Sequence, residues 1–311
     1  MIDSGVLRGK NMKLNLIQTA ITFTVISAGF VPTAYSERVS HPSQLAQQVA
    51  QLRAQGPRGL EIFLNTHRDS LNNPSPEMRE ALDALCQQRD CYASKLYWYT
   101  DLAQAKAAAI ATGKPILSLR LLGRLDQDLS CANSRFFRVA LYPNAEIAQF
   151  LRDRYILHWE SVRDVPKVTV DFGDGRKLER TLTGNSIHYI LDSSGRPIDA
   201  IPGLYGPQAF RRQLTEAEQA VKNYTQTQGA AKESFLRDYH RQRLAAIQRQ
   251  WAADLAKLGI QNPPRLLGMP ADNSEPPSAA IAGTIAVGKM RVEAPLVQNV
   301  SLATRNQAAL R

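Results

Sequence analysis

The pattern of apolar and polar residues changes partway along the chain. In its first part, apolar positions recur at helical spacing in residues 42–54 and 75–88, and residues 59–73 between them read as irregular. Further on, short apolar runs alternate with helical patterns, which is typical of an α/β domain. The chain therefore predicts a helical lead-in at residues 37–94, followed by an α/β domain at residues 95–225.

The α/β domain has a regular order of predicted elements. Strands are expected at 96–100, 116–122, 155–161, 186–191 and 197–201, helices at 101–112, 145–154 and 206–225, and a hairpin of 168–172 with 177–183. The run at 116–122 is apolar enough for a buried central strand. A basic amphipathic helix is predicted at 229–259, and prolines predict a mostly disordered tail at 260–311.

The first 36 residues have the pattern of an export signal. Residues 14–31 are apolar and follow a lysine, and small residues at Ala34 and Ser36 fit a signal-peptidase site. We interpret residues 1–36 as the signal-peptide region, with translation starting at Met12. This predicts a periplasmic or secreted protein. The alternative is a retained membrane anchor, because the apolar stretch is close to the lower length limit of a spanning helix.

Composition adds a diffuse basic excess to this picture. The chain has 311 residues, an apolar share of 44% and a formal net charge of +10. The apolar share is ample for a core, and the basic residues form no dense tract. We therefore expect no nucleic-acid partner, and membrane contact only through an uncleaved signal segment or the basic C-terminal helix.

The chain has three cysteines, and export matters to them because disulfides persist outside the cytosol. Cys86 and Cys91 are close enough in sequence for a small disulfide loop, which leaves Cys131 as the odd thiol. In the alternative, Cys86 is only a buried apolar residue, since it shares a helical stripe with Leu82 and Leu85. The sequence leaves both interpretations open.

Cys131 is the candidate reactive residue. It follows an apolar strand and opens a helical run that breaks at 142–144. At the start of a helix, unpaired N–H groups and the helix dipole favour a thiolate. The residue three positions on is Ser134, whose hydroxyl can donate a hydrogen bond to a thiolate but cannot resolve a mixed disulfide.

Four stretches resemble the thioredoxin-like superfamily: GKPILSLRLL, DLSCANSRFF, GNSIHYILDSSGRPI and GLYGPQAFRRQL. The resemblance covers residues 95–225 and implies a three-layer sandwich with a central mixed sheet, flanked by the helical lead-in and the C-terminal helix. It implies a C-x-x-S variant of the active site, with Cys131 and Ser134 in the two catalytic positions.

The resemblance also implies a substrate-binding loop at Asn185, Ser186 and His188. Ser186 stands where the family has a cis-proline, and we expect a trans bond there, because a cis bond before a non-proline residue costs about 2.5 to 4 kcal/mol. We interpret His188 as a core histidine; the alternatives are an activated pair with Cys131 or a shared soft metal. Further ligands are too few, so we expect no metal and no cofactor.

Two functions follow from these residues. The first is an exported thioredoxin-like protein that uses Cys131 for one-step exchange, or for a mixed disulfide with a protein or small-molecule thiol. The second is a non-catalytic thioredoxin-fold module that binds a partner at the cell envelope, which the loss of the resolving cysteine and of the cis-proline favours. We expect a redox-related role without expecting turnover, so whether the protein is an enzyme stays open.

Overall fold

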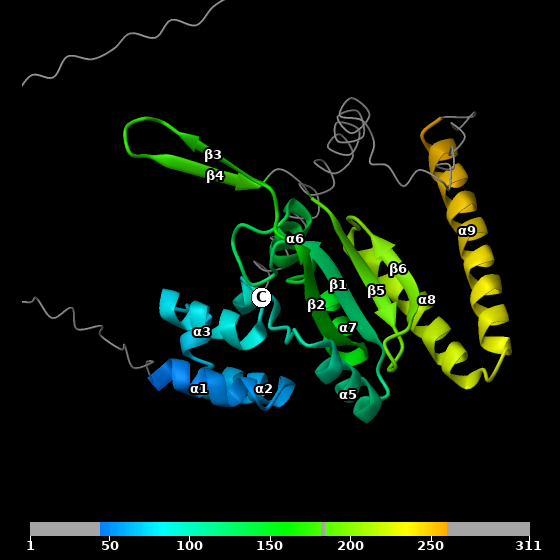
Figure 1. The fold of residues 1–311 in the computed structure, drawn as a ribbon, viewed down its shortest axis with the longest axis horizontal. Helices are drawn as coiled ribbons and strands as arrows, with labels where there is room; N and C mark the ends of the chain where they lie inside the picture. The colour runs from blue at the N-terminus through cyan, green and yellow to red at the C-terminus, as the bar shows by residue number, and fades with distance from the viewer. Residues whose placement is uncertain (1–43, 182–183, 260–311) are drawn as a thin grey trace, which may run out of the picture. The chain divides into compact units, whose positions relative to one another are not determined.

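The computed structural model describes residues 44–181 and 184–259 (Figure 1). The predicted signal peptide and tail lie outside these residues. The described elements are α1 (Gln44–Arg53), α2 (Pro57–Thr66), the 3-10 turn η1 (Ser70–Asn72), α3 (Pro76–Cys86), α4 (Cys91–Ser94), α5 (Leu102–Thr112), β1 (Ile116–Leu122), α6 (Ala132–Phe136), the π-helical turn η2 (Phe137–Leu141), α7 (Ala145–Arg154), β2 (Ile156–Arg163), β3 (Lys167–Asp171), β4 (Lys177–Thr181), β5 (Ser186–Leu191), β6 (Pro197–Pro202), α8 (Pro207–Gln226) and α9 (Ala231–Lys257).

The fold class is mixed α/β, as the sequence predicts. One sheet has the order β2-β1-β5-β6, with β2 parallel to β1, and with β5 and β6 each antiparallel to its neighbour. Leu117 and Leu119 of β1 pack in the same apolar cluster as residues of η2, α7 and α8. Ile116 belongs to a second cluster with Ala105 and Ala109 of α5. Apolar side chains therefore cover β1 on both faces, which makes it the buried central strand.

Two sequence predictions in the lead-in and its junction are wrong. The stretch 59–73 is not irregular, because α2 occupies most of it. An added Cβ at Gly59 would collide with the backbone of Leu52, so this glycine permits close contact between α1 and α2. The predicted strand at 96–100 is a single bridge between Tyr99 and His158.

The lead-in has its own apolar cluster, formed by α1 to α4 and the residues that follow them. Phe63, Leu82, Leu85, Cys86 and Cys91 are fully buried there. Ser75 caps α3 by accepting a hydrogen bond from the Met78 N–H group, and Pro76 occupies the first helical position. The lead-in is therefore a packed part of the protein rather than a linker.

Two elements extend from the sheet. The hairpin of β3 and β4 forms a separate two-stranded sheet that projects from the body of the protein in Figure 1. The helix α9 follows α8, and Leu236 is its one buried residue. Within the described ranges, no helix combines the length and the apolar character needed to cross a membrane.

Candidate functional site

Cys131 stands at the start of α6, where the sequence places it. It has extended backbone angles, φ −61° and ψ 158°, and its Sγ accepts a hydrogen bond from the Ser134 N–H group at 3.4 Å. The sulfur therefore caps the helix in the way that a serine or aspartate oxygen usually does. The helix continues through η2, so the cap serves a longer helical run than α6 alone.

The loop before β5 covers the sulfur. Cys131 is fully buried, and its thiol donates a hydrogen bond to the Asn185 carbonyl at 3.5 Å. Next to it, the Asn133 Nδ2 atom donates to the Ser186 Oγ atom at 3.0 Å. The structure thus joins Cys131 to Asn185, and the neighbouring Asn133 to Ser186, so two of the three predicted loop residues lie at the start of α6.

Ser134 does not have the orientation that we expected. Its hydroxyl donates to the Cys131 carbonyl at 2.9 Å and lies 2.6 Å from the Ser130 hydroxyl. Only the backbone N–H group of Ser134 faces the sulfur. The prediction that the Ser134 hydroxyl bonds to the sulfur is therefore wrong for this arrangement, because that hydroxyl bonds instead to the Cys131 carbonyl and to the hydroxyl of Ser130, which precedes the helix.

His188 points into the core. Its Nε2 lies 2.8 Å from the Tyr142 hydroxyl, and its ring packs against Phe137 and Phe210 with ring centres 4.8 and 5.0 Å away. Burial lowers the pKa of His188 to about 3, so the imidazole is neutral at physiological pH. These contacts agree with the prediction that His188 is a core histidine. They do not agree with the alternative of an activated pair of His188 and Cys131.

His158 has a similar environment on β2. Its Nδ1 lies 2.8 Å from the Ser118 hydroxyl, and burial, helped by the charge of Arg120, lowers its pKa to about 4. Among the residues with described positions, no three His, Cys, Asp or Glu side chains gather as a metal site would require.

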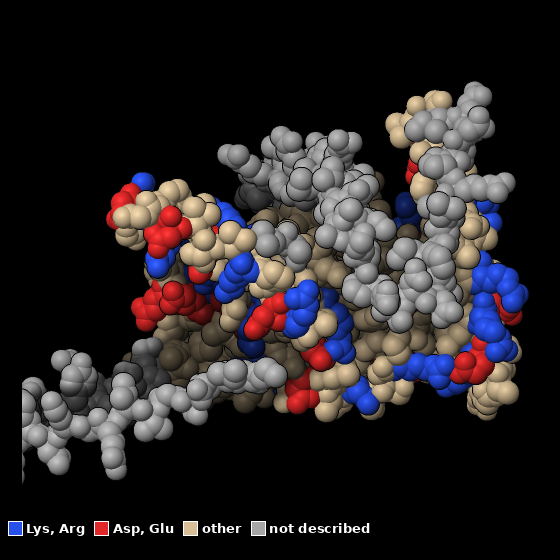
Figure 2. Space-filling view, turned by 45° about the horizontal axis from the view of Figure 1, so that its top comes forward, with Lys and Arg blue, Asp and Glu red and all other residues tan. Residues whose placement is uncertain are grey.

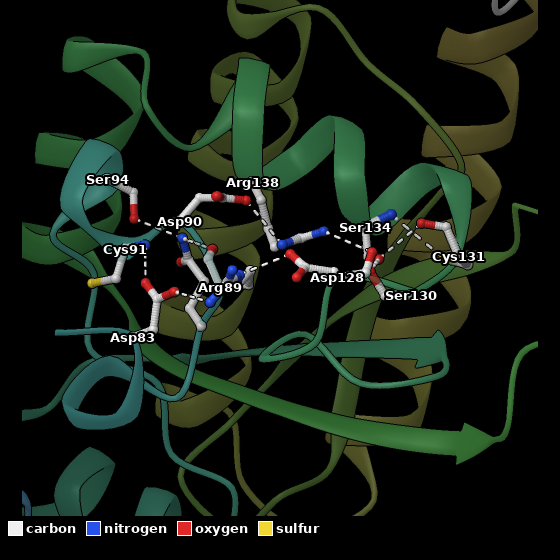
Figure 3. A network of polar contacts seen from close by, with 11 residues as sticks. Asp83, Arg89, Asp90, Cys91, Ser94, Asp128, Ser130, Cys131, Ser134 and Arg138 are labelled. Carbon is white, nitrogen blue, oxygen red and sulfur yellow. Dashed lines mark hydrogen bonds and ion pairs between the residues drawn. The ribbon is translucent and has the colours of Figure 1, made fainter. Parts of the chain in front are cut away.

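An ion-pair network that the sequence did not predict joins this site to the lead-in (Figure 3). Arg138, which lies on the helical run that Cys131 opens, is almost fully buried and pairs with Asp90 at 2.9 Å. Arg89 pairs with Asp128 at 2.8 Å and with Asp83 at 3.3 Å. The charged pair Arg89-Asp90 inside CQQRDC was the available signal, but nothing in the sequence indicated its partners.

Cys86 and Cys91 bracket the loop that carries these charges. Their Cα atoms lie 6.3 Å apart and their sulfur atoms face each other at bonding distance, so the geometry permits the predicted disulfide. Both residues are also fully buried in the lead-in cluster, so the two sequence interpretations are compatible rather than exclusive. Asp83 accepts a hydrogen bond from the Cys91 N–H group at 2.8 Å, which holds the loop against α3.

Comparison with known proteins finds no family model that matches the chain and no curated protein that matches it. One fully buried thiol, hydrogen-bonded as a donor and accompanied by a serine in the second position, has neither the exposure nor the partner that multi-turnover thiol exchange requires.

Proposed function

We propose that the chain is an exported, thioredoxin-like binding module in which Cys131 is a structural thiol and not a catalyst. One observation carries this proposal: the Cys131 sulfur is fully buried, and its thiol donates a hydrogen bond to the Asn185 carbonyl. A reactive cysteine has to be accessible to its substrate and has to be deprotonated. A buried thiol that donates a hydrogen bond is neither accessible nor deprotonated.

The topology of the sheet supports the thioredoxin-like part of the proposal. The four stretches that carry the resemblance coincide with β1, with α6 and the turn before it, with β5 and β6, and with the start of α8. The central strand β1 leads to Cys131, and the loop before β5 contacts this residue from the other side. The two loops that form the active site of such proteins are therefore neighbours here.

The hairpin of β3 and β4 supports a binding role. Val168, Val170 and Phe172 alternate along the chain and are all exposed, so they share one face of the hairpin. Leu178 lies opposite Val170 on the same face. An isolated two-stranded hairpin is only marginally stable in water, and an exposed apolar face is typical of a protein-binding surface.

One-step thiol exchange is the second candidate, favoured by the Ser134 N–H group that faces the sulfur at 3.4 Å. Displacement of the loop before β5 would let the thiol lose its proton to solvent. The thiolate would then attack one sulfur of a disulfide, form a mixed disulfide with it and release the other sulfur as a thiolate. This N–H group would stabilise the attacking thiolate.

Alkylation of the full-length protein at neutral pH separates the two candidates. For the binding module, Cys131 should react at least about 100-fold more slowly in the native protein than in urea, because alkylation then requires local opening. Cys131→Ser is the control: a serine can cap the helix and donate to the same carbonyl, so stability should change by less than about 1 kcal/mol. A native rate equal to that in urea would overturn the proposal and favour exchange.

A further inference from the structure

The helix α9 is anchored over its first half only. The Tyr239 hydroxyl donates to Asp199 at 2.7 Å, and the Arg243 Nε atom pairs with the same carboxylate at 2.8 Å. Phe235 stacks on Tyr239, and Leu236 is buried in the main core. Beyond Arg243 the helix continues to Lys257 with no buried residue.

The second half of α9 forms one wall of an apolar groove. The groove has a volume of about 890 Å³ and lies between α9, the first part of α8 and β6. Its apolar wall on α9 consists of Leu244, Ile247, Trp251, Leu255 and Leu258, which recur at helical spacing. Leu244 is 56% exposed, Ile247 49% and Leu258 74%, which is unusual for one continuous stripe.

We propose that this groove binds the chain's own C-terminal segment, residues 272–288. Residues 276–288 carry no charged side chain and include Ile281, Ile285 and Val287, which suit an apolar wall. Asp272 and Glu275 lie just before them. An apolar stretch preceded by two carboxylates is the chemistry that this groove would recognise.

Charge complementarity supports this occupant. Among the groove's charged residues, Arg243 pairs with Asp199 and Glu216, and Asp254 lies 3.6 Å from Lys257. Arg212 also lines the groove, and it has no ion-pair partner in the part of the chain that the structure describes. At the right edge of the molecule in Figure 2, Lys and Arg side chains lie beside Asp and Glu side chains, so Arg212, and not a general basic patch, supports this occupant.

The chain length allows the segment to return. Leu258, the last groove residue, is followed directly by the stretch that leads to the segment. Residues 260–271 can span up to about 40 Å when extended. The wall from Leu244 to Leu258 is roughly 21 Å long at the rise of an α-helix. A tethered segment also reaches an effective concentration on the order of millimolar, which favours it over a free partner.

Trp251 reports on the occupant in the full-length protein. The chain has three tryptophans, and Trp98 and Trp159 are buried in the core. The difference in acrylamide quenching between the wild type and Trp251→Phe therefore isolates Trp251. We expect Trp251 to be protected in the wild type, and its quenching to rise several-fold in the double variant Ile281→Asp/Ile285→Asp.

Two further variants sharpen the test. Ser301→Asp/Thr304→Asp adds the same charge beyond the segment and should leave the quenching unchanged. Arg212→Glu should expose Trp251, and combining it with Asp272→Lys/Glu275→Lys should restore the protection. This reversal would show that the segment itself, and not a general loosening of α9, covers the groove.

Three results would overturn the proposal. The first is equal quenching of Trp251 in the wild type and in Ile281→Asp/Ile285→Asp. The second is protection that depends on protein concentration together with a dimer in sedimentation, which would assign the groove to a second copy. The third is protection that appears only with anionic phospholipid vesicles, which would assign it to a membrane surface. None of these results bears on the role of the thiol, so the two proposals can fail separately.

Discussion

Replacing Asp90 with asparagine should destabilise the protein more than the partial exposure of Asp90 suggests. The Arg138 side chain is only 3% exposed, whereas that of Asp90 is 31% exposed. Their pair, at 2.9 Å, is the one carboxylate contact of the Arg138 guanidinium within the described ranges. Asp90 has a positive φ of 62°, a conformation that asparagine tolerates as well as aspartate, so the exchange adds no backbone strain.

The expected cost follows from the burial of the arginine. At an effective dielectric constant of 20, unit charges 4 Å apart attract by about 4 kcal/mol, and removing one partner of a buried pair usually costs about 3 to 5 kcal/mol. Burial is the main influence that lowers the pKa of Arg138, and Asp90 is the first that raises it. Because water reaches part of the Asp90 carboxylate, we expect a loss of about 2 to 3 kcal/mol.

Urea unfolding of the oxidised full-length protein would measure this loss. Asp174→Asn is the matched control, because both members of its ion pair with Arg176 are exposed to solvent, so the substitution should leave the stability nearly unchanged. Adding Arg138→Met to Asp90→Asn should recover much of the stability, since no unpaired charge then stays buried. If Asp90→Asn and the control differ by less than about 0.5 kcal/mol, the buried pair does not stabilise the site.

Three more changes have expected outcomes. Burial lowers the pKa of His188 to about 3, so the unfolded chain takes up the proton first and stability falls as the pH drops below about 6.5, by up to about 1.4 kcal/mol per pH unit. His188→Gln, which can still bond to Tyr142, should make that fall shallower; parallel pH profiles would contradict this. Cys86→Ala/Cys91→Ala should cost about 2 kcal/mol in urea unfolding, and no loss would mean that the two cysteines are not joined. An added Cβ at Gly184 would overlap the side chain of Asn133, which bonds to Ser186. Gly184→Ala should therefore speed the alkylation of Cys131, and an unchanged rate would refute the contact between Asn133 and Ser186.

The central elements of the fold could be predicted because local signals agree with the tertiary structure. The apolar runs of β1 and β5 have the boundaries expected from the sequence. Asp101 caps α5 through the Ala103 and Gln104 N–H groups, and Gly113 ends it in the left-handed conformation. Where capping and periodicity coincide, the sequence is sufficient to place the element.

The aromatic run at 96–100 shows where such signals fail. Its composition favours a strand, but side-chain contacts with the lead-in hold it instead. The Trp98 indole donates to Gln88 at 2.7 Å, and the Tyr97 hydroxyl donates to the Arg53 carbonyl at 3.2 Å. Tertiary packing brings Gln88 and Arg53 to these aromatic residues from earlier parts of the chain. A local propensity for strands cannot reveal such contacts.

Some features of the candidate site follow from the local sequence, and others depend on contacts with distant residues. The place of Cys131 at a helix start follows from local pattern, but its burial depends on the Asn185 carbonyl, 54 residues later. The orientation of Ser134 is set by a short-range contact, because its hydroxyl bonds to that of Ser130, four residues earlier and just before the N-cap. The sequence can therefore propose a thiol site, but only the loop contact decides whether the thiol is available.

The ion pairs also bear on where the folding unit ends. Arg138 lies within the predicted α/β domain at residues 95–225, whereas its partner Asp90 belongs to the lead-in. A chain cut at residue 95 would leave the Arg138 guanidinium buried without a carboxylate and would remove the Arg89 that pairs with Asp128 beside the site. The sequence predicts a separate domain at residues 95–225, but the physical unit that holds Cys131 in place has to include the loop between Cys86 and Cys91.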